Sequence, residues 1–421
     1  MRKSLFIIAL LALAPVSSIA QTTLEEIAAT PEKAGGIYYA YPYYDAENTP
    51  APKGYKPFYI SHYGRHGSRY LISENDYTDL RDRLMHADAN NALTPLGKDV
   101  LGRLDLAYKE AKGRAGELTP LGNRQHHDIA TRMYQAYPEV FVDDAEISAT
   151  STTVMRCAHS MFAFTEGLKE QNPALKIPRE SSNATMYYMN AHVPECGQMA
   201  SKEGPWYQTW RRFNEANLSG DRLAASLFSD KEYVDTWIDP MKLLDQVYRL
   251  AIDMQNAETP VKFTDLLTDE ELYNLWKSSN FSFFARNSSY APAENAHLDC
   301  SKTLIQNIID SADAYVDGGK TGATLRFGHD GNITPLTGQL RLKGCYTGET
   351  EPEGVCATWS DYRISPMGAN LQIVFFRNKQ GDVLAKVLLN EREIAVDGVP
   401  TDSYPYYKWS DLRAHLVKAA Q

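Results

Sequence analysis

The segment "YGRHGSRY" (63–70) places His66 directly after one arginine, Arg65, and three positions before a second, Arg69. Guanidinium groups bind phosphate oxygens in pairs, and a histidine between two of them can act as a nucleophile or as a general acid or base. Gly67 lets an anion approach the backbone closely. We therefore interpret the segment as part of a site for a small, doubly charged anion; taken alone, it could also be a basic surface loop in an ion-pair network.

A second segment, "RFGHDGN" (326–332), joins His329 to Asp330. A metal pair is one interpretation, but metal-dependent phosphate chemistry needs further His and Asp ligands, and the other histidines show no supporting spacing. His126 and His127 are adjacent on a predicted helix, so they point in different directions, and we interpret them as residues of its polar face. Asp330 without a metal could protonate a leaving alcohol, since that role needs one carboxyl group facing the phosphate.

A third candidate is Arg156 in "TSTTVMRCAHS" (150–160), just after a predicted strand and near the start of a predicted helix. The amide groups at a helix N-terminus already favour an anion. A lone arginine at such a place is uninformative, because most are solvated. Arg156 becomes a candidate because two other strand ends carry residues suited to the same small anion.

The elements around these residues are expected to bring them together. Strands are predicted at 58–62, 146–149 and 322–327, and each runs into one of the three segments. Ligands of open α/β sheets bind beyond the carboxyl ends of the strands. The sequence therefore predicts that the three segments meet at one edge of a sheet.

Further elements complete the fold prediction. "LTPLG" occurs at 93–97 and 118–122 and predicts two helix starts, with threonine as the cap and proline in the first turn. A hairpin is predicted from 371–376 and 382–390.

The segment 200–290 is rich in aromatic residues at helical spacing. We expect an α/β fold with a central, mostly parallel sheet flanked by helices: a signal peptide (1–20), a core (21–160 and 295–421) and a mostly helical inserted cap (161–294).

The motifs together resemble those of the histidine acid phosphatases, the acid phosphatase and phytase branch of the histidine phosphatase superfamily. The resemblance rests on Arg65-His66-Gly67-x-Arg69, the distant His329-Asp330, Arg156 in its strand-to-helix context, and "LTPLGNRQHHDIATRMY" (118–134), and it extends over nearly the whole chain. It implies that His66 attacks phosphorus to form a phosphohistidine and that Asp330 protonates the leaving alcohol. It implies further that Arg65, Arg69, Arg156 and His329 hold the phosphoryl oxygens, with no metal or other cofactor. An acidic optimum follows, because Asp330 must be protonated at the first step.

Two departures leave the substrate open. The family often has proline at the position of Leu71, and Tyr70 is instead similar to the multiple inositol polyphosphate phosphatases, which carry His-Ala-Glu at 329–331. A general phosphomonoesterase is the main hypothesis, and a phytase or inositol polyphosphate phosphatase is the alternative. A basic rim would favour the alternative, and its candidate residues are Lys202, Arg211 and Arg212. A non-catalytic phosphate-binding protein is disfavoured, because such a protein needs neither nucleophile nor acid.

Composition and the N-terminus bound the location and the partners. The net charge of −10 argues against nucleic acid or an anionic membrane surface as a partner, but not against a small phosphomonoester. Residues 1–20 read as a signal peptide, and no later apolar stretch is long enough for a membrane span. A glycan at the sequon of Asn332 would block the second motif, which favours a bacterial periplasmic or secreted protein. The oligomeric state stays open.

The five cysteines all lie after the predicted signal peptide, in the part of the chain expected to be exported. Disulfides persist in such oxidising compartments outside the cytoplasm. We expect Cys345 and Cys356 to pair, because "CYTGETEPEGVC" closes a short, turn-rich loop. The odd number leaves at least one thiol free or paired between chains.

Overall fold

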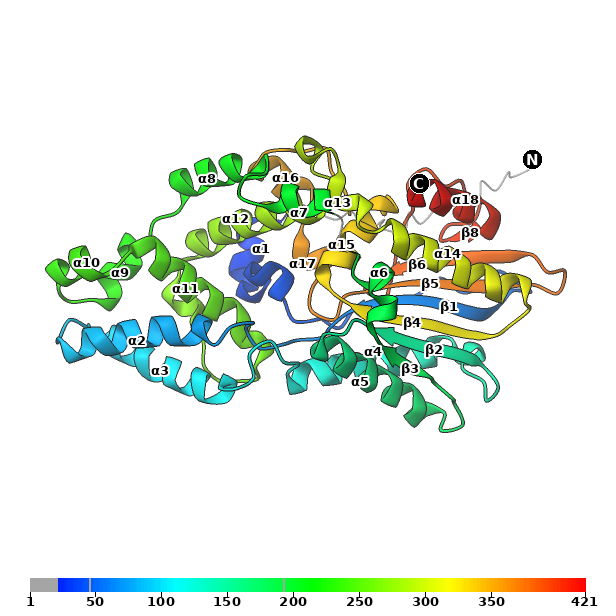
Figure 1. Cartoon of the computed structure of the whole chain (residues 1–421), viewed down its shortest axis with the longest axis horizontal. Helices are drawn as coiled ribbons and strands as arrows, with labels where there is room; N and C mark the ends of the chain where they lie inside the picture. Colours follow the sequence, from blue (N-terminus) through cyan, green and yellow to red (C-terminus); the bar gives the residue numbers. More distant parts are fainter. Residues whose placement is uncertain (1–21, 45–46, 192–193) are drawn as a thin grey trace, which may run out of the picture.

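The computed structural model describes residues 22–44, 47–191 and 194–421, and in this part of the chain eight strands form one sheet (Figure 1). The sheet order is β3-β2-β4-β1-β5-β6-β7, and β8 also pairs with β6. Strands β1 to β4 are parallel to one another, whereas β5 runs antiparallel to β1. The strands are β1 (Lys56–Arg65), β2 (Glu146–Ser151), β3 (Arg179–Ser181), β4 (Gly322–Gly328), β5 (Asn370–Arg377), β6 (Val383–Leu389), β7 (Arg392–Glu393) and β8 (Tyr406–Lys408).

The predicted fold class is confirmed, together with the local elements on which it depends. The three predicted strands are β1, β2 and β4, and β5 and β6 form the predicted hairpin. Both predicted threonine caps exist. Thr94 accepts a hydrogen bond from the Gly97 amide at the start of α3 (Pro95–Ala111), and Thr119 accepts one from Gly122 at the start of α4 (Pro120–Ala136).

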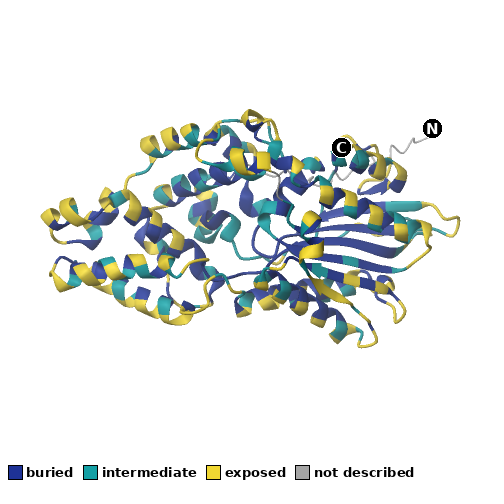
Figure 2. Ribbon diagram, viewed as in Figure 1, coloured by how far each residue is buried: buried dark blue, intermediate teal, exposed yellow. Residues whose placement is uncertain are grey.

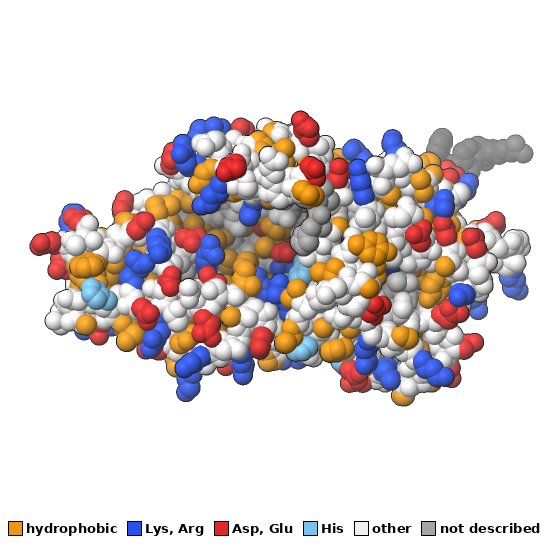
Figure 3. Space-filling view, in the orientation of Figure 1, with side chains coloured by type: hydrophobic (Ala, Val, Ile, Leu, Met, Phe, Trp, Pro, Cys, Tyr) orange, Lys and Arg blue, Asp and Glu red, His pale blue; other side chains and the backbone are white. Residues whose placement is uncertain are grey.

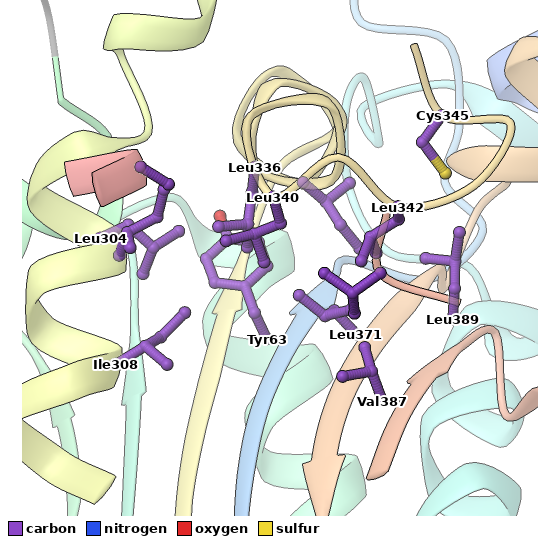
Figure 4. Close-up of a cluster of buried hydrophobic side chains, with 14 of the residues drawn as sticks. Tyr63, Leu304, Ile308, Leu336, Leu340, Leu342, Cys345, Leu371, Val387 and Leu389 are labelled. Carbon is purple, nitrogen blue, oxygen red and sulfur yellow. The ribbon is translucent and has the colours of Figure 1, made fainter. Parts of the chain in front are cut away.

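Helices cover both faces of the sheet, and the central strands β4, β1 and β5 are almost wholly buried (Figure 2). On one face, α4 and α5 (Met155–Gln171) pack on Ile60, Ile147 and Leu325. The other face packs against α14 (Lys302–Asp317), α15 (Asp330–Gln339) and α18 (Trp409–Ala420). Figure 4 shows Tyr63 and Leu371 from the strands pointing toward the leucines of α14 and α15. Side chains alternate between the faces, so one strand serves both apolar clusters.

A helical region extends from this three-layer core and has an apolar cluster of its own. The cluster joins α2 (Asn75–Ala89) and α3 to α9 (Asp221–Leu227), α11 (Pro240–Asp253) and α12 (Asp269–Asn287). The segment 200–290 is mostly helical, as expected, but the cluster also contains α2 and α3, which precede the predicted cap. The predicted domain boundaries stay a prediction.

The remaining short elements connect these layers. They are α1 (Leu24–Ala29), η1 (Pro31–Tyr38), η2 (Pro138–Val140), η3 (Asn183–Thr185), α6 (Met186–Met189), α7 (Pro194–Ala200), α8 (Trp206–Asn217), α10 (Lys231–Trp237), η4 (Met254–Asn256), η5 (Thr264–Leu266), η6 (Ala291–Ala293), α13 (Ala296–Asp299), α16 (Pro352–Thr358) and α17 (Asp361–Ile364). The predicted signal peptide, 1–20, lies outside the described residues. Across the ranges that the structure covers, no helix is both long and apolar enough to span a membrane.

The predicted cysteine pair is wrong, because the disulfide joins Cys196 of α7 to Cys300, directly after α13. Cys345 lies in the apolar cluster of the sheet and α15 (Figure 4), whereas Cys356 lies in the cluster of the helical region. The turn-rich sequence between them includes α16, which directs Cys356 toward α12, where Asn280 donates a hydrogen bond to its sulfur. Short separation in sequence did not reveal that the two side chains face different clusters.

The assignment predicts which thiols react. Denatured, unreduced protein should take up alkylating reagent at Cys157, Cys345 and Cys356, which are unbonded in the described chain. Peptide mapping by mass spectrometry should find Cys196 linked to Cys300. A linked peptide containing Cys345 and Cys356 would contradict the assignment.

Candidate active site

The register of the parallel strands brings the predicted site residues to one edge of the sheet. Arg65, the last residue of β1, lies opposite Gly328 at the end of β4, and Ser151 at the end of β2 lies opposite Phe327. The chain segments that follow these three strands therefore begin side by side. The rings of His66 and His329 lie 5.8 Å apart between centroids, although 263 positions (329 minus 66) separate them in the sequence.

The backbone around His66 fixes both its position and its tautomer. The His66 amide donates to the Gly328 carbonyl at 2.9 Å, and its own carbonyl accepts from the Gly368 amide. Nδ1 lies 2.9 Å from the Gly67 carbonyl oxygen, which can only accept, so Nδ1 carries the proton and Nε2 keeps its lone pair. Burial, and then the charges of Arg65 and Arg156, hold the pKa of His66 well below its usual range. The ring is therefore neutral at mildly acidic pH, with a free nucleophilic nitrogen.

The Arg65 side chain is fully buried and held on several sides. Its Nη1 donates to the carbonyls of Ile37 and Ser365, at 2.5 and 2.7 Å, and its Nη2 lies 3.1 Å from Oδ2 of Asp330. Arg69, at 5% exposure, is also buried. This burial excludes the alternative of a solvated basic surface loop.

Helix α4 supports the loop after β1 by close backbone contact. A Cβ atom on Gly67 would come within 2.4 Å of the Gly122 carbonyl oxygen, so this position requires glycine. Thr119 donates to the Ser68 carbonyl through both its amide and its hydroxyl group, and Gln125 accepts from the Ser68 amide. The second "LTPLG" segment (118–122) therefore does more than begin a helix, because its Thr119 and Gly122 contact the backbone of the loop after β1.

Sequence reasoning missed the contribution of His126, which it placed on a polar face. His126 is buried, and its Nε2 donates to the Arg65 carbonyl at 3.0 Å. Burial lowers its pKa to about 4, so it stays neutral. His127 instead faces outward and pairs with Glu170 at 2.7 Å. The buried stripe of Gly122, His126 and Ile129, at i, i+4 and i+7, was the available signal.

Arg69 and Arg156 complete a cluster of three guanidinium groups. Arg69 lies over the ring of Tyr38 at 4.8 Å, and Arg156 is in the first turn of α5. Burial and the neighbouring Arg69 lower the pKa of Arg156. Within the described residues, the buried Nε atoms of Arg65, Arg69 and Arg156 have no hydrogen-bond partner. Buried donors that lack an acceptor are costly, so the cluster is suited to an anion that supplies the missing oxygens.

His329 and Asp330 stand at the start of α15, where the helix dipole also favours an anion. The His329 amide donates to the Tyr63 hydroxyl, and its Nε2 lies 3.1 Å from Oγ1 of Thr152. Burial lowers the pKa of His329 to about 4. Burial alone would raise the pKa of Asp330, but Arg65, His329 and Arg69 outweigh it and hold the carboxyl below its usual range.

The cluster of basic residues is also visible on the surface of the molecule. Figure 3 shows a hollow in the middle of one face, with basic and histidine side chains at its floor.

Arg286 is a further cation near the site that the sequence did not indicate. It lies on the last turn of α12, close enough to Asp330 for their charges to interact, and 5.2 Å from the centre of the Trp206 ring. Its surroundings, "FSFFARNSSY" (281–290), looked only like helix core in the sequence.

The predicted rim residues lie on or just before α8 and are exposed. Arg211 pairs with Glu215, Arg212 donates to Thr209, and Lys202 lies over the Tyr207 ring. Among all described side chains, no group of three or more His, Cys, Asp or Glu residues is arranged to hold a metal ion.

Comparisons with known proteins relate the whole chain to one family. The family model of the histidine phosphatase superfamily (branch 2) matches residues 64–390. Multiple inositol polyphosphate phosphatase 1 of Gallus gallus is 23% identical over 354 residues, which cover 78% of this chain and 75% of that protein.

Two solved structures have a similar fold. The multiple inositol polyphosphate phosphatase of Bifidobacterium longum in complex with phosphate has a TM-score of 0.72 at 20% identity, with 92% of this chain and 98% of that chain covered. The phytase from D. castellii has a TM-score of 0.66 at 14% identity, covering 92% and 85%.

The unsatisfied guanidinium donors predict that an anion stabilises the free protein. Sulfate at a hundred times its dissociation constant should add about 2.7 kcal/mol to the free energy of unfolding. Thermal unfolding with and without sulfate measures the gain. Arg69→Gln and Arg156→Gln should each reduce it, whereas Arg211→Gln, on exposed α8, should not. An equal gain in all four proteins would show that sulfate acts elsewhere.

Proposed function

The chain belongs to the histidine phosphatase superfamily, branch 2, and is a hydrolase of phosphate monoesters; we propose the following division of that work among its residues. His66 attacks the phosphorus atom through Nε2. The observation that carries this assignment is the contact of Nδ1 with the Gly67 carbonyl, which leaves Nε2 unprotonated beside three guanidinium groups. A histidine that served only to bind an anion would do so better as a cation.

In the first step, the bond between Nε2 and phosphorus forms as the bond from phosphorus to the ester oxygen breaks. Arg65, Arg69 and Arg156, with His329, hold the equatorial oxygens and offset the charge that develops on them. Asp330 gives its proton to the departing alcohol. The product of this step is a phosphohistidine and a free alcohol.

In the second step, the Asp330 carboxylate takes a proton from water, and the water oxygen attacks the phosphohistidine. His66 leaves with its lone pair restored, and inorganic phosphate dissociates. The same carboxyl group thus acts first as acid and then as base, without a metal or other cofactor. A non-catalytic phosphate-binding protein has no need of this group beside the histidine.

The ion pair of Arg65 with Asp330 bears on the pH dependence. In the free site the pKa of Asp330 is below its usual range, so the acid form needed for the first step is scarce near neutral pH. A bound phosphate dianion competes for Arg65 and raises that pKa, and low pH adds to the protonated fraction. An acidic optimum follows from both effects.

Inositol polyphosphates are the second candidate substrate class. The names of the similar proteins, which include multiple inositol polyphosphate phosphatases and a phytase, favour it. Arg286 adds a half-buried cation on the α12 side of Asp330, where a second phosphate of such a substrate could be held. The exposed Lys202, Arg211 and Arg212 are weaker candidates, because each already has a partner on or beside α8.

Export to the periplasm or to the medium is proposed on two grounds. The sequence of residues 1–20 has the features of a signal peptide, and the Cys196–Cys300 disulfide suits an oxidising compartment.

Trapping the intermediate tests the catalytic roles. Wild-type protein quenched in acid-free denaturant during turnover of a labelled aryl phosphate should carry label on His66. His66→Ala should lose the label, and its turnover should fall by about three orders of magnitude or more. His159→Ala, an exposed histidine of α5, is the matched control and should behave as wild type. Label on another residue would overturn the assignment.

Leaving-group dependence tests Asp330 separately. Asp330→Asn should slow release of an alkyl alcohol by about 10²–10⁴-fold. The first step with an acidic phenol should slow much less, because a phenolate leaves without a proton. Burst kinetics with both substrate types measure this step, and an equal loss for both would remove the proton-donor role.

Substrate ratios test the second candidate. Arg286→Gln should lower kcat/KM for phytate about tenfold more than kcat/KM for an aryl phosphate, because the aryl ester has no second phosphate. Lys231→Gln, which removes an exposed cation of α10 paired with Asp235, is the control and should leave the ratio near the wild-type value. Equal losses for both substrates would make Arg286 a support of the reaction centre and not a specificity residue.

A further inference from the structure

Asp253, the last residue of α11, is a carboxyl group with no solvent exposure. It accepts hydrogen bonds from the Tyr77 hydroxyl of α2 at 3.4 Å and from Nδ2 of Asn256 at 3.3 Å. Both contacts are at the long end of the hydrogen-bond range. A buried carboxylate with contacts this weak is costly when ionised, so a nearby cation matters to it.

That cation is Arg69 of the loop after β1. Burial lowers the pKa of Arg69, but its interactions with the Tyr38 side chain and the Asp253 carboxylate outweigh this effect, so the net shift is upward. Hydrogen bonds join the two sides, since the Ser68 hydroxyl donates to Oδ1 of Asn256 at 2.7 Å, and Nδ2 of Asn256 donates to the Tyr38 carbonyl at 2.9 Å. Asp253 is therefore held directly behind the loop, on the helical side of the site, and Figure 1 shows α11 and α2 side by side there.

We propose that Asp253 is a positioning residue that sets how strongly Arg69 holds an anion. When Asp253 is neutral, the guanidinium charge of Arg69 is free to attract the phosphoryl oxygens. When it is ionised, the carboxylate competes for that charge and draws the guanidinium group back toward α11. The inference rests on the proposed role of Arg69 and adds a pH-linked control of substrate affinity.

The charged groups around the site make Asp253 the main candidate for titration near neutral pH. Burial raises the pKa of Asp253 to about 7, and Arg69 limits the rise. Tyr77 from α2 faces Asp253, and burial raises the pKa of its hydroxyl, so it stays neutral. From η1, the contact is made by the backbone carbonyl of Tyr38, which carries no charge. Arg249, on α11 itself, is engaged by Asp245 and Asp76. On α9, the charged residues Asp221 and Arg222 are exposed.

The other groups of the site change charge at lower pH. The pKa values of His66, His329 and Asp330 are all shifted downward, away from neutrality. Asp361 is the one other carboxyl group in the described chain that we identify as able to titrate near neutral pH, because burial raises its pKa to about 6. It accepts a hydrogen bond from Trp276 and lies near Arg65. Since anion binding favours neutral Asp253, affinity should rise as the pH falls through about 7.

Sulfate is a suitable probe, because it keeps two charges from about pH 5 to pH 9 and is not turned over. Its dissociation constant for the wild-type chain, measured by calorimetry, should rise about tenfold between pH 5.5 and pH 8.5, which corresponds to a one-unit change in the pKa of the linked group. In Asp253→Asn it should stay flat, near the wild-type value at low pH. Asp76→Asn removes a carboxylate that contacts Arg249 and not Arg69, and it should keep the wild-type rise.

A second variant covers the case in which Asp253→Asn does not fold. Tyr77→Phe removes an O–H donor from ionised Asp253, so the midpoint of the sulfate curve should move to higher pH. The proposal is overturned if the wild-type curve is flat, if Asp253→Asn keeps the rise, or if Asp361→Asn alone abolishes it. Sulfate binding requires no turnover, so a chain that releases no phosphate but keeps the pH-linked curve would disprove the catalytic roles and leave this inference standing.

Discussion

Three guanidinium groups withdrawn from water at one edge of a sheet are the constraint around which this site is built. Arg65 and Arg69 are almost wholly buried, and the mutual repulsion of such groups with Arg156 is only partly offset inside the protein. Placing them requires rigid support, which the strand register and the carbonyl contacts of Arg65 supply. An anion bound to these groups would offset the cost of burying them. Burial, and then the charges of the same arginines, hold the pKa of His66 well below its usual range, so the arrangement that suits an anion also suits the nucleophile proposed for His66.

Counter-charges reach the cluster from both parts of the molecule. The sheet side supplies Asp330 at the start of α15, where it pairs with Arg65. The helical side supplies Asp253 at the end of α11 and the ring of Tyr38 under Arg69. Arg65 and Arg69 thus both contact η1, through the Ile37 carbonyl and the Tyr38 ring, but they face different carboxyl groups. The contacts of Asn256 with Ser68 and with Tyr38 keep this helical region packed against the loop after β1.

Local sequence signals were sufficient for the strands and the capped helices, and they predicted that the six residues of the motifs meet at one edge of the sheet, whereas the roles of these residues stay a proposal. Alternation, cap chemistry and strand-end position are properties of short segments, and the parallel register then placed Arg65, Arg156 and Asp330 together. Residues whose role depends on a distant partner were not predictable in this way. His126 contacts the Arg65 carbonyl, Asp253 is linked to Ser68 through Asn256, and Cys196 is bonded to Cys300. In each case the informative neighbour lies tens to hundreds of positions away, and for His126 the local pattern suggested only a polar face.

The low pKa of Asp330 in the free site looks at first unsuited to a proton donor. An acid whose pKa stayed high would, however, be a poor base for the second step, in which the same carboxyl group must take a proton from water. In the proposed mechanism, pairing with Arg65 solves this problem, because a phosphate dianion on the arginines would loosen the pair, and dispersal of the charge on phosphorus would tighten it again. On this proposal the substrate brings the charge that makes Asp330 an acid, and formation of the phosphohistidine returns Asp330 to the state of a base. Buried positive charge is what allows one carboxyl group to serve both steps.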